Sequence, residues 1–282
     1  KQPSESNPAL AYSKDLGLEY NLSFMNYYLS EQLNKEKNFY VLNSSKWLLN
    51  CGVANAYNSK LWYLTKTPFS NNFFKQVIFD LSNLYGSTKG LSKKLLILDL
   101  DDTLWGGIVG EVGWKNLRVG GHDHLGEAFR DFQIQIKALK NQGIILALVS
   151  KNDEAIAIEA INNHPEMILA MKDFVTHRIN WEDKAKNIVD IVDELNLGLQ
   201  SVVFLDDSSF ERARVQEALP EVLVPELPKD PTDYNTFLSK LRCFDTTNIT
   251  EEDKIRANLY KSESKRTKLK QQLKSLSDWI KT

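Results

Sequence analysis

The stretch LLILDLDDTLWGG, at positions 95–107, joins an apolar run to three aspartates, Asp99, Asp101 and Asp102. The first four residues are aliphatic without alternation, which predicts a strand buried on both of its faces. Burying an unpaired carboxylate is expensive, so acidic residues at the tip of such a strand need a compensating group. A bound cation is the simplest group of this kind.

Apolar strands and amphipathic helices alternate after this stretch. The helical periodicity lies at 125–141, 153–163 and 182–196, and the further apolar runs lie at 144–150, 173–179 and 201–207. Buried strands separated by such helices predict an α/β fold, a doubly wound parallel sheet with helices on both faces. Ligands of these sheets bind beyond the carboxyl ends of the strands.

Polar residues end three of the predicted strands. Asp99 with Asp101, then Ser150, then the pair Asp206 and Asp207 occupy these positions. Acid pairs repel unless a cation lies between them, and carboxylate oxygens with water suit Mg²⁺. A carboxylate can attack phosphorus when a metal neutralises the repulsion, and a second acid two residues on can transfer the proton. We therefore expect magnesium-assisted phosphoryl chemistry.

Four motifs resemble those of the haloacid dehalogenase superfamily. DLDDT at 99–103 is similar to its DxDx(T/V) signature, and Ser150 in LALVS, Lys184 in NWEDKAKN and the acid pair of VVFLDD follow in the family's order. The longer strings DLDDTLWGGIVGE, LALVSKNDE, VVFLDDSSFER and LPEVLVPELPKDP resemble the FkbH-like branch. Members of that branch often occur in polyketide and surface-polysaccharide pathways.

The resemblance implies roles for the acidic residues. Asp99 would be the nucleophile and a Mg²⁺ ligand, and Asp101 would be the general acid and base, binding the metal through its backbone carbonyl. Asp206 would complete the metal site. Each role is physically sensible, because phosphoryl transfer depends mainly on positioning and on charge stabilisation.

The same resemblance implies the phosphate site. Ser150 and Lys184 would hold the phosphoryl oxygens. Lys151 and Asn152 are further phosphate-binding candidates, although they could equally serve only to begin the following helix. Three other residues would support the site from behind it: Asp102, Thr103 and Asp207.

No cap domain fits between these motifs, because the gaps from Thr103 to Ser150 and from Ser150 to Lys184 are filled by the predicted helices and strands. An open site favours a bulky substrate, a macromolecular carrier, or closure by another domain. Trp105, Trp114 and Trp181 could contact such a substrate, but packing is the more common role of aromatic residues in loops of this kind.

The chain divides in sequence into three parts. Residues 1–92 predict a small N-terminal α/β segment, with a strand at 38–42, that resembles part of an SGNH hydrolase but lacks its DxxH pair. Residues 93–245 form the predicted phosphatase domain. Residues 246–282 predict a long amphipathic helix that leads to a further domain, and its basic face could bind an acidic acyl carrier protein.

Composition narrows the remaining classes of partner. The formal net charge of −2 makes nucleic acid an unexpected partner. No apolar run approaches the roughly 20 residues that span a bilayer, so no membrane contact is expected. Cys51 and Cys243 lack disulfide or zinc-ligand spacing, which fits a reducing cytoplasm.

These observations favour a Mg²⁺-dependent phosphohydrolase or phosphotransferase that forms an aspartyl phosphate with a phosphorylated small molecule. One alternative is a glyceryl transferase that dephosphorylates bisphosphoglycerate and loads an acyl carrier protein. Another is a non-catalytic scaffold subunit of a biosynthetic pathway.

Overall fold

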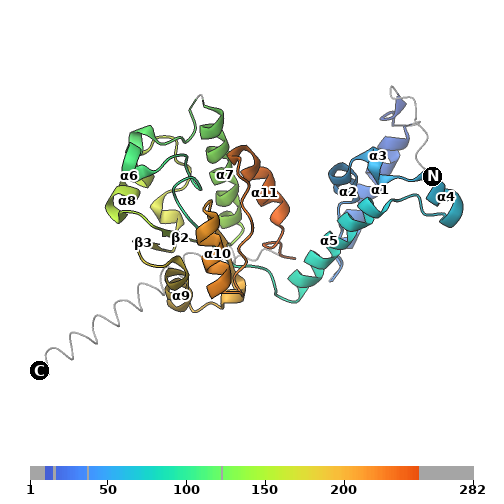
Figure 1. Cartoon of the computed structure of the whole chain (residues 1–282). Helices are drawn as coiled ribbons and strands as arrows, with labels where there is room; N and C mark the ends of the chain where they lie inside the picture. The colour runs from blue at the N-terminus through green and yellow to red at the C-terminus, as the bar shows by residue number, and fades with distance from the viewer. Residues whose placement is uncertain (1–9, 15–16, 37, 122, 248–282) are drawn as a thin grey trace, which may run out of the picture. The chain divides into compact units, whose positions relative to one another are not determined.

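A computed structural model describes residues 10–14, 17–36, 38–121 and 123–247 (Figure 1). The chain divides between Lys89 and Gly90 into two compact units. None of the described helices combines the length and apolar character that crossing a membrane requires. The predicted C-terminal helix lies outside the described residues, and the finer domain limits stay predictions.

The second unit contains a four-stranded parallel sheet in the order β3-β2-β1-β4. Its strands are β1 (Leu95–Leu98), β2 (Ile145–Ser150), β3 (Thr176–Ile179) and β4 (Val202–Leu205). The predicted doubly wound α/β fold is therefore confirmed. Leu98 at the end of β1 pairs with Leu148 and with Leu205. This register brings the polar residues after β1, β2 and β4 to one edge of the sheet.

Helices cover both faces of this sheet (Figure 1). One face packs against α7 (His124–Asn141), α8 (Glu154–Asn163) and α11 (Tyr234–Leu241), and the other against α9 (Lys184–Glu194) and α10 (Ser209–Ala218). The four residues of β1 alternate between the two cores and are fully buried. Burial of each such side chain stabilises the fold by about 1.5–3 kcal/mol.

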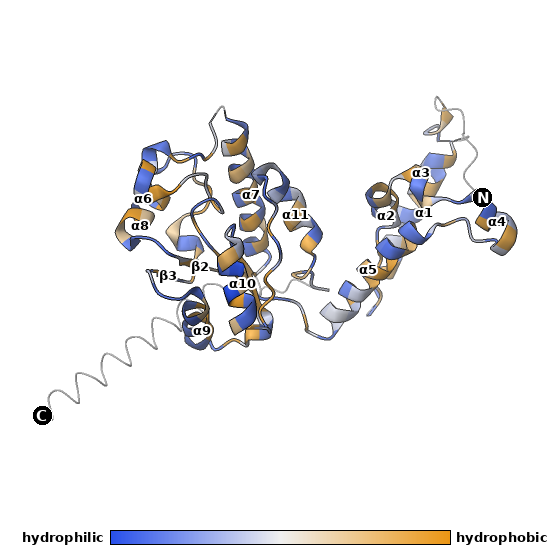
Figure 2. Cartoon of the chain, in the orientation of Figure 1, coloured by the Kyte–Doolittle hydropathy of each residue, from blue (hydrophilic) through white to orange (hydrophobic). Residues whose placement is uncertain are grey.

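The helices beside the sheet are amphipathic, as the mixed hydropathy along α7 and α9 shows (Figure 2). Polar residues fix where three of them begin. Asp153 caps α8, Asp183 caps α9 and Ser208 caps α10, each through a side-chain oxygen that accepts a backbone N–H. These caps hold the loops that follow the strands, where the candidate functional residues lie.

The remaining ordered structure of this unit is short. Helix α6 spans Val109–Val112 and follows the Gly106-Gly107 turn. Single 3₁₀ turns lie at the following positions: Trp114–Asn116, Met171–Asp173, Leu199–Ser201 and Pro231–Asp233.

In the N-terminal unit the described residues form helices and no strand, which corrects the α/β prediction for this segment. Its described residues form α1 (Leu18–Leu33), α2 (Ser44–Cys51), α3 (Val53–Ala56), α4 (Ser59–Thr65) and α5 (Asn71–Thr88). The strand predicted at 38–42 was wrong. An apolar run makes a strand only where another strand pairs with it, and no described segment pairs with this one, so its side chains are largely exposed.

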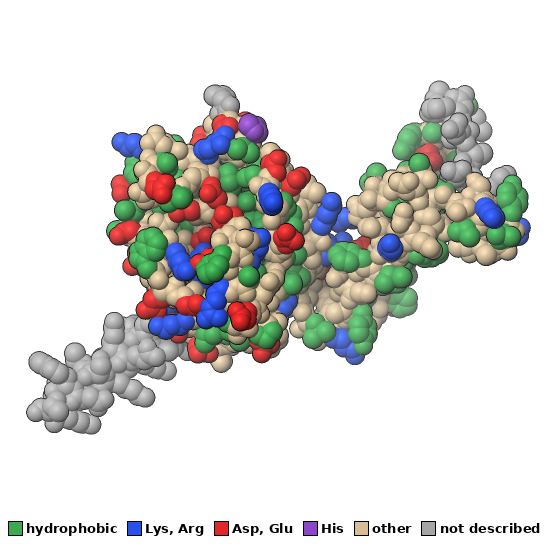
Figure 3. All heavy atoms as spheres, in the orientation of Figure 1, with side chains coloured by type: hydrophobic (Ala, Val, Ile, Leu, Met, Phe, Trp, Pro, Cys, Tyr) green, Lys and Arg blue, Asp and Glu red, His purple; other side chains and the backbone are tan. Residues whose placement is uncertain are grey.

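An aromatic cluster packs α2 against α5 in this unit. Phe69 stacks on Phe73 with ring centroids 4.2 Å apart, and Trp47 meets Phe73 edge-on at 5.9 Å. The Trp47 indole donates a hydrogen bond of 2.7 Å to Asp80 Oδ2. Many other apolar side chains of this unit are exposed (Figure 3). The resemblance to part of an SGNH hydrolase stays a prediction.

Candidate active site

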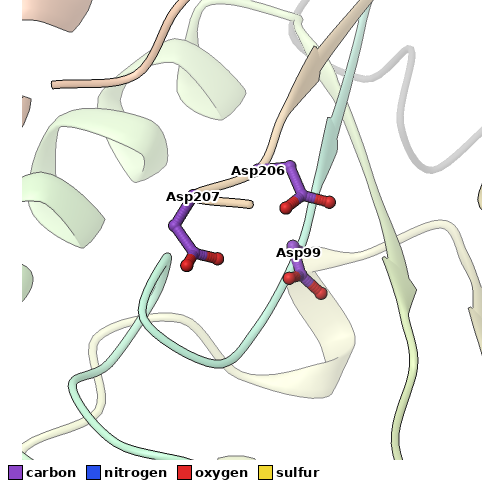
Figure 4. A group of neighbouring side chains, drawn as sticks. All are labelled: Asp99, Asp206 and Asp207. Carbon is purple, nitrogen blue, oxygen red and sulfur yellow. The ribbon is translucent and has the colours of Figure 1, made fainter. Parts of the chain in front are cut away.

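Three aspartates meet at the carboxyl edge of the sheet (Figure 4). Asp99 follows β1, and Asp206 and Asp207 follow β4. One carboxylate oxygen of each lies within 4.8 Å of the others. Asp99 and Asp206 are buried, whereas Asp207 is exposed. Carboxylates this close repel one another unless cations or protons neutralise them.

Lys184 supplies one positive charge to this cluster. Its Nζ atom lies 2.6 Å from Asp206 Oδ2 and 3.0 Å from Asp99 Oδ2, and its side chain is only 3% exposed. Lys184 is the first residue of α9, which Asp183 caps, so the helix start aims it at the strand ends. Burial alone would lower the pKa of Lys184, but the charges of Asp99 and Asp206 raise it overall.

One oxygen of the cluster is left without a partner. Asp99 Oδ1 is buried and accepts no hydrogen bond from any described residue. A buried unpaired carboxylate oxygen is costly, and it is a hard ligand of the kind that Mg²⁺ prefers. The residues present therefore fit a magnesium ion held by Asp99 together with Asp206 or Asp207.

Burial and mutual repulsion also make these carboxyls weak acids. Burial and the charge of Asp99 raise the pKa of Asp206, although Lys184 opposes the shift. Burial and the charges of Asp99 and Asp102 raise the pKa of Asp207 to about 6. Cation binding to such a cluster would release protons near neutral pH.

Asp101 lies beside the cluster and accepts three hydrogen bonds. Its Oδ1 atom accepts from the Trp105 indole at 2.7 Å and from the Val109 amide at 3.0 Å. Its Oδ2 atom accepts from the Asn152 amide at 2.7 Å. Burial raises the pKa of Asp101 even though these three donors oppose the shift. A carboxyl with a raised pKa is suited to carry a proton in catalysis.

Asp102 and Thr103 hold the turn that follows β1. Asp102 has a left-handed backbone with φ of +51°, and its Oδ1 atom accepts the Gly107 amide at 2.8 Å. Thr103 Oγ1 accepts the Asp207 amide at 3.1 Å and lies 3.4 Å from Asp207 Oδ1. Thr103 thus links the ends of β1 and β4.

Ser150, the last residue of β2, and the two residues after it have separate partners. Ser150 is buried, and its carbonyl accepts the amide of Asn180. Lys151 Nζ pairs with the largely buried Glu211 at 2.6 Å, and Asn152 binds Asp101 rather than standing open to solvent. The phosphate contacts expected for Ser150, Lys151, Asn152 and Lys184 stay predictions.

Sequence reasoning missed two contacts that organise this edge. The Trp105 indole is fully buried and binds Asp101, and a buried indole N–H needs an acceptor, which could have indicated the contact. Arg212 donates from Nη1 to the carbonyls of Asp206 and Asp207 at 2.7 and 2.6 Å. No local pattern signals that second contact.

A cavity of about 460 Å³ opens beside Asp102 and Asp207. Its walls are partly apolar, with Phe129, Leu227 and Tyr234 among them. Tyr234 also donates to the carbonyl of Asp102 at 3.1 Å, which fixes the wall to the turn after β1. The cavity volume is in the range of small-molecule binding sites.

No family model matches the chain, and no curated protein matches it. Among solved structures, it is similar to the N-terminal part of the protein BF1531 from Bacteroides fragilis, which contains a phosphatase domain and is complexed with Mg. The identity is 39% with a TM-score of 0.81, over 86% of this chain and 64% of that one. This chain thus spans less than two thirds of that structure.

A HAD family enzyme from Bacteroides thetaiotaomicron, in a magnesium complex, is a more distant match. The identity is 13% and the TM-score 0.37, over 53% of this chain and all of that one, which is too distant to bear on function. Three observations indicate the same kind of protein. The motifs follow the order expected from the sequence, Asp99, Lys184 and Asp206 meet at one edge of the sheet, and the chain is similar to the Bacteroides fragilis phosphatase domain. In its fold and in the order of its motifs the second unit resembles the phosphatase domains of the haloacid dehalogenase superfamily.

Proposed function

We propose that this protein is a Mg²⁺-dependent phosphatase that acts through an aspartyl phosphate at Asp99. The observation that carries the proposal is the unpartnered, buried Oδ1 atom of Asp99, inside a group of three acids and beside the ammonium of Lys184. The similar Bacteroides fragilis structure, a phosphatase domain complexed with Mg, supports it.

The residues divide the chemistry between them. A carboxylate oxygen of Asp99 attacks phosphorus, the bond from phosphorus to the leaving oxygen breaks, and the carboxyl of Asp101 gives its proton to that oxygen. Water then attacks the phosphorus of the aspartyl phosphate and gives a proton to Asp101. The bond between phosphorus and the Asp99 oxygen breaks, which releases phosphate and restores Asp99. Magnesium, held by Asp99 and Asp206, would neutralise charge on the phosphoryl group.

The substrate that we propose is a phosphate ester of a small molecule. The cavity beside Asp102 and Asp207 lies next to the acid cluster and offers space for the alcohol part of the ester. Membership of the FkbH-like branch and a cytoplasmic location remain part of the proposal, and the free cysteines fit a reducing compartment.

Glyceryl transfer to an acyl carrier protein is not favoured by any contact of the described residues. The basic face expected to meet such a carrier lies at 254–274, outside them. The scaffold alternative would require the acid cluster to be unused. Metal-dependent turnover therefore separates it from the phosphatase.

The test is the Asp99→Asn variant with p-nitrophenyl phosphate and Mg²⁺. We expect turnover to fall at least about a thousandfold, since an amide oxygen is a poor nucleophile toward phosphorus. Asp131→Asn, which changes an exposed aspartate on α7, is the matched control and should retain full activity. Retained Mg²⁺-dependent turnover in Asp99→Asn would remove Asp99 as the nucleophile. An inactive wild-type protein would favour the scaffold.

A further inference from the structure

We propose that Trp105 and Asn152 are positioning residues that orient the carboxyl of Asp101 so that its Oδ2 atom carries the transferred proton. The inference rests on the proposed phosphatase function. The two side chains come from different parts of the chain. Trp105 follows Asp101 by four residues, and Asn152 follows it by 51.

The Oδ1 atom of Asp101 is fully engaged. It accepts the Trp105 indole at 2.7 Å and the Val109 amide at 3.0 Å. A carboxylate oxygen has two lone pairs in the plane of the group, and two N–H donors occupy both of them. A proton at Oδ1 would displace one donor and leave it buried without an acceptor, which costs about 1–3 kcal/mol.

The Oδ2 atom differs, because Asn152 at 2.7 Å is its single hydrogen-bond donor among the described residues. Its second lone pair can therefore hold a proton while all three hydrogen bonds persist. In the first step this proton passes to the leaving oxygen as its bond to phosphorus breaks. In the second step the attacking water returns a proton to the same atom.

The donors are held rigidly enough to fix that orientation. Trp105 is fully buried, and the next residue, Gly106, exchanges two backbone hydrogen bonds with Arg118. A Cβ atom at Gly106 would lie 2.9 Å from the Phe129 ring, so the turn is tightly packed. Asn152 is 5% exposed and immediately precedes the N-cap residue of α8.

The indole of Trp105 and the amide of Asn152 are also uncharged donors. An arginine or lysine at either position would favour the ionised carboxylate strongly, whereas indole and amide N–H groups orient it at a smaller electrostatic cost to the acid form. This arrangement suits a residue that must alternate between acid and base.

The test compares leaving groups. Trp105→Phe removes the indole donor, and Asn152→Leu removes the amide. An alkyl phosphate needs a proton on its leaving oxygen, whereas 2,4-dinitrophenyl phosphate leaves without one. We expect kcat/KM for the alkyl phosphate to fall about 10²-fold or more in each variant, which is the usual size of a general-acid effect.

For 2,4-dinitrophenyl phosphate we expect kcat/KM to change less than about fivefold, because the first step then needs no acid. Its kcat should fall, and a burst of dinitrophenolate should precede the steady state, because hydrolysis of the aspartyl phosphate still needs Asp101 as the base. A loss of folded protein alone would lower kcat/KM for both substrates by the same factor.

Trp114→Phe is the matched control, since the Trp114 indole donates to the exposed Glu159 at 3.1 Å. This variant should leave kcat/KM for both substrates unchanged. Equal losses for the two substrates, or no loss, would overturn the assignment while the phosphatase function stands. A wild-type protein that turns over neither ester would overturn both. If Asn152→Leu does not fold, Asn152→Ser, which keeps a small polar group, and Trp105→Phe decide the outcome.

Discussion

At the scale of single residues, Lys184 is the group on which the acid cluster depends. Its ammonium contacts Asp99 and Asp206 together, and all three side chains are buried. Two buried carboxylates without that charge would face each other in a medium of low dielectric. The Asp183 cap begins α9 at Lys184 and so fixes the lysine at the end of the sheet.

Lys184→Met should lower the free energy of unfolding by about 3–5 kcal/mol at pH 7 without metal, since it leaves two buried carboxyl groups without their positive partner. The raised pKa of Lys184 means that its charge contributes fully below pH 10.5 and that this contribution is lost as the pH rises through the folded-state value. Urea unfolding measures the loss, and added Mg²⁺ should reduce it.

Lys186→Met is the control on the same helix. Lys186 pairs with Glu182 at 2.7 Å, but both side chains are more than half exposed, so the variant should lower the free energy of unfolding far less than Lys184→Met does. Similar losses in the two variants would mean that the buried contacts of Lys184 contribute no more than a surface pair.

At the scale of elements, buried polar side chains join the segments that surround the sheet. Gln133 on α7 donates to the carbonyl of Leu104 at 2.7 Å and accepts the amides of Ile168 and Leu169. It thereby fixes the turn that carries Trp105. Buried polar groups with complete partners specify one arrangement of the elements around them.

Asp173 makes a similar connection and is sensitive to pH. It is buried before β3 and accepts from Lys140 on α7 at 3.0 Å and from the Ala170 amide at 3.0 Å. Burial would raise the pKa of Asp173, but these donors and the charge of Lys137 lower it below 3.8. Its stabilising effect is therefore present above pH 3.8 and is lost as the pH falls through the folded-state value.

Asp173→Asn should accordingly lower the free energy of unfolding by about 1–3 kcal/mol at pH 7. The difference from the wild type should persist at pH 5 and shrink below pH 3.8. Urea unfolding at several pH values measures it. Asp131→Asn, at an exposed position on α7, should show no such difference. A deficit that grows on acidification would contradict the assigned sign.

At the scale of the whole molecule, the carboxylates of the acid cluster repel one another at the edge of a well-packed sheet. Positive and negative side chains are intermixed on the face of the second unit that Figure 3 shows. Lys184 compensates part of the charge of the cluster, and the unpartnered Asp99 Oδ1 atom leaves a place for a cation. Stability of the chain should therefore depend on metal.

Magnesium at 100 times its dissociation constant should stabilise the folded chain by about 2.7 kcal/mol. We expect the midpoint of thermal unfolding to rise by several degrees relative to the protein in EDTA. Asp206→Asn should abolish the rise while Asp131→Asn retains it. A rise that survives Asp206→Asn would place the metal elsewhere in the molecule.

The fold class and most of the acid cluster were predictable because the signals are local. A run of four aliphatic residues indicates a buried strand, and acids directly after Leu98 and Leu205 must reach the same edge once the strands are parallel. The failure at 38–42 has the same physical origin, since a strand needs a partner and the local pattern contains no information about one.

Amino-acid order alone determined the alternation of strands and helices, and with it the edge at which Asp99 and Asp206 gather. It could not determine which donors reach Asp101, because Trp105, Val109 and Asn152 arrive from a turn, a short helix and a strand end. Hydrogen bonds depend on distances of a few tenths of an ångström. Such distances are set only when the separate segments pack together.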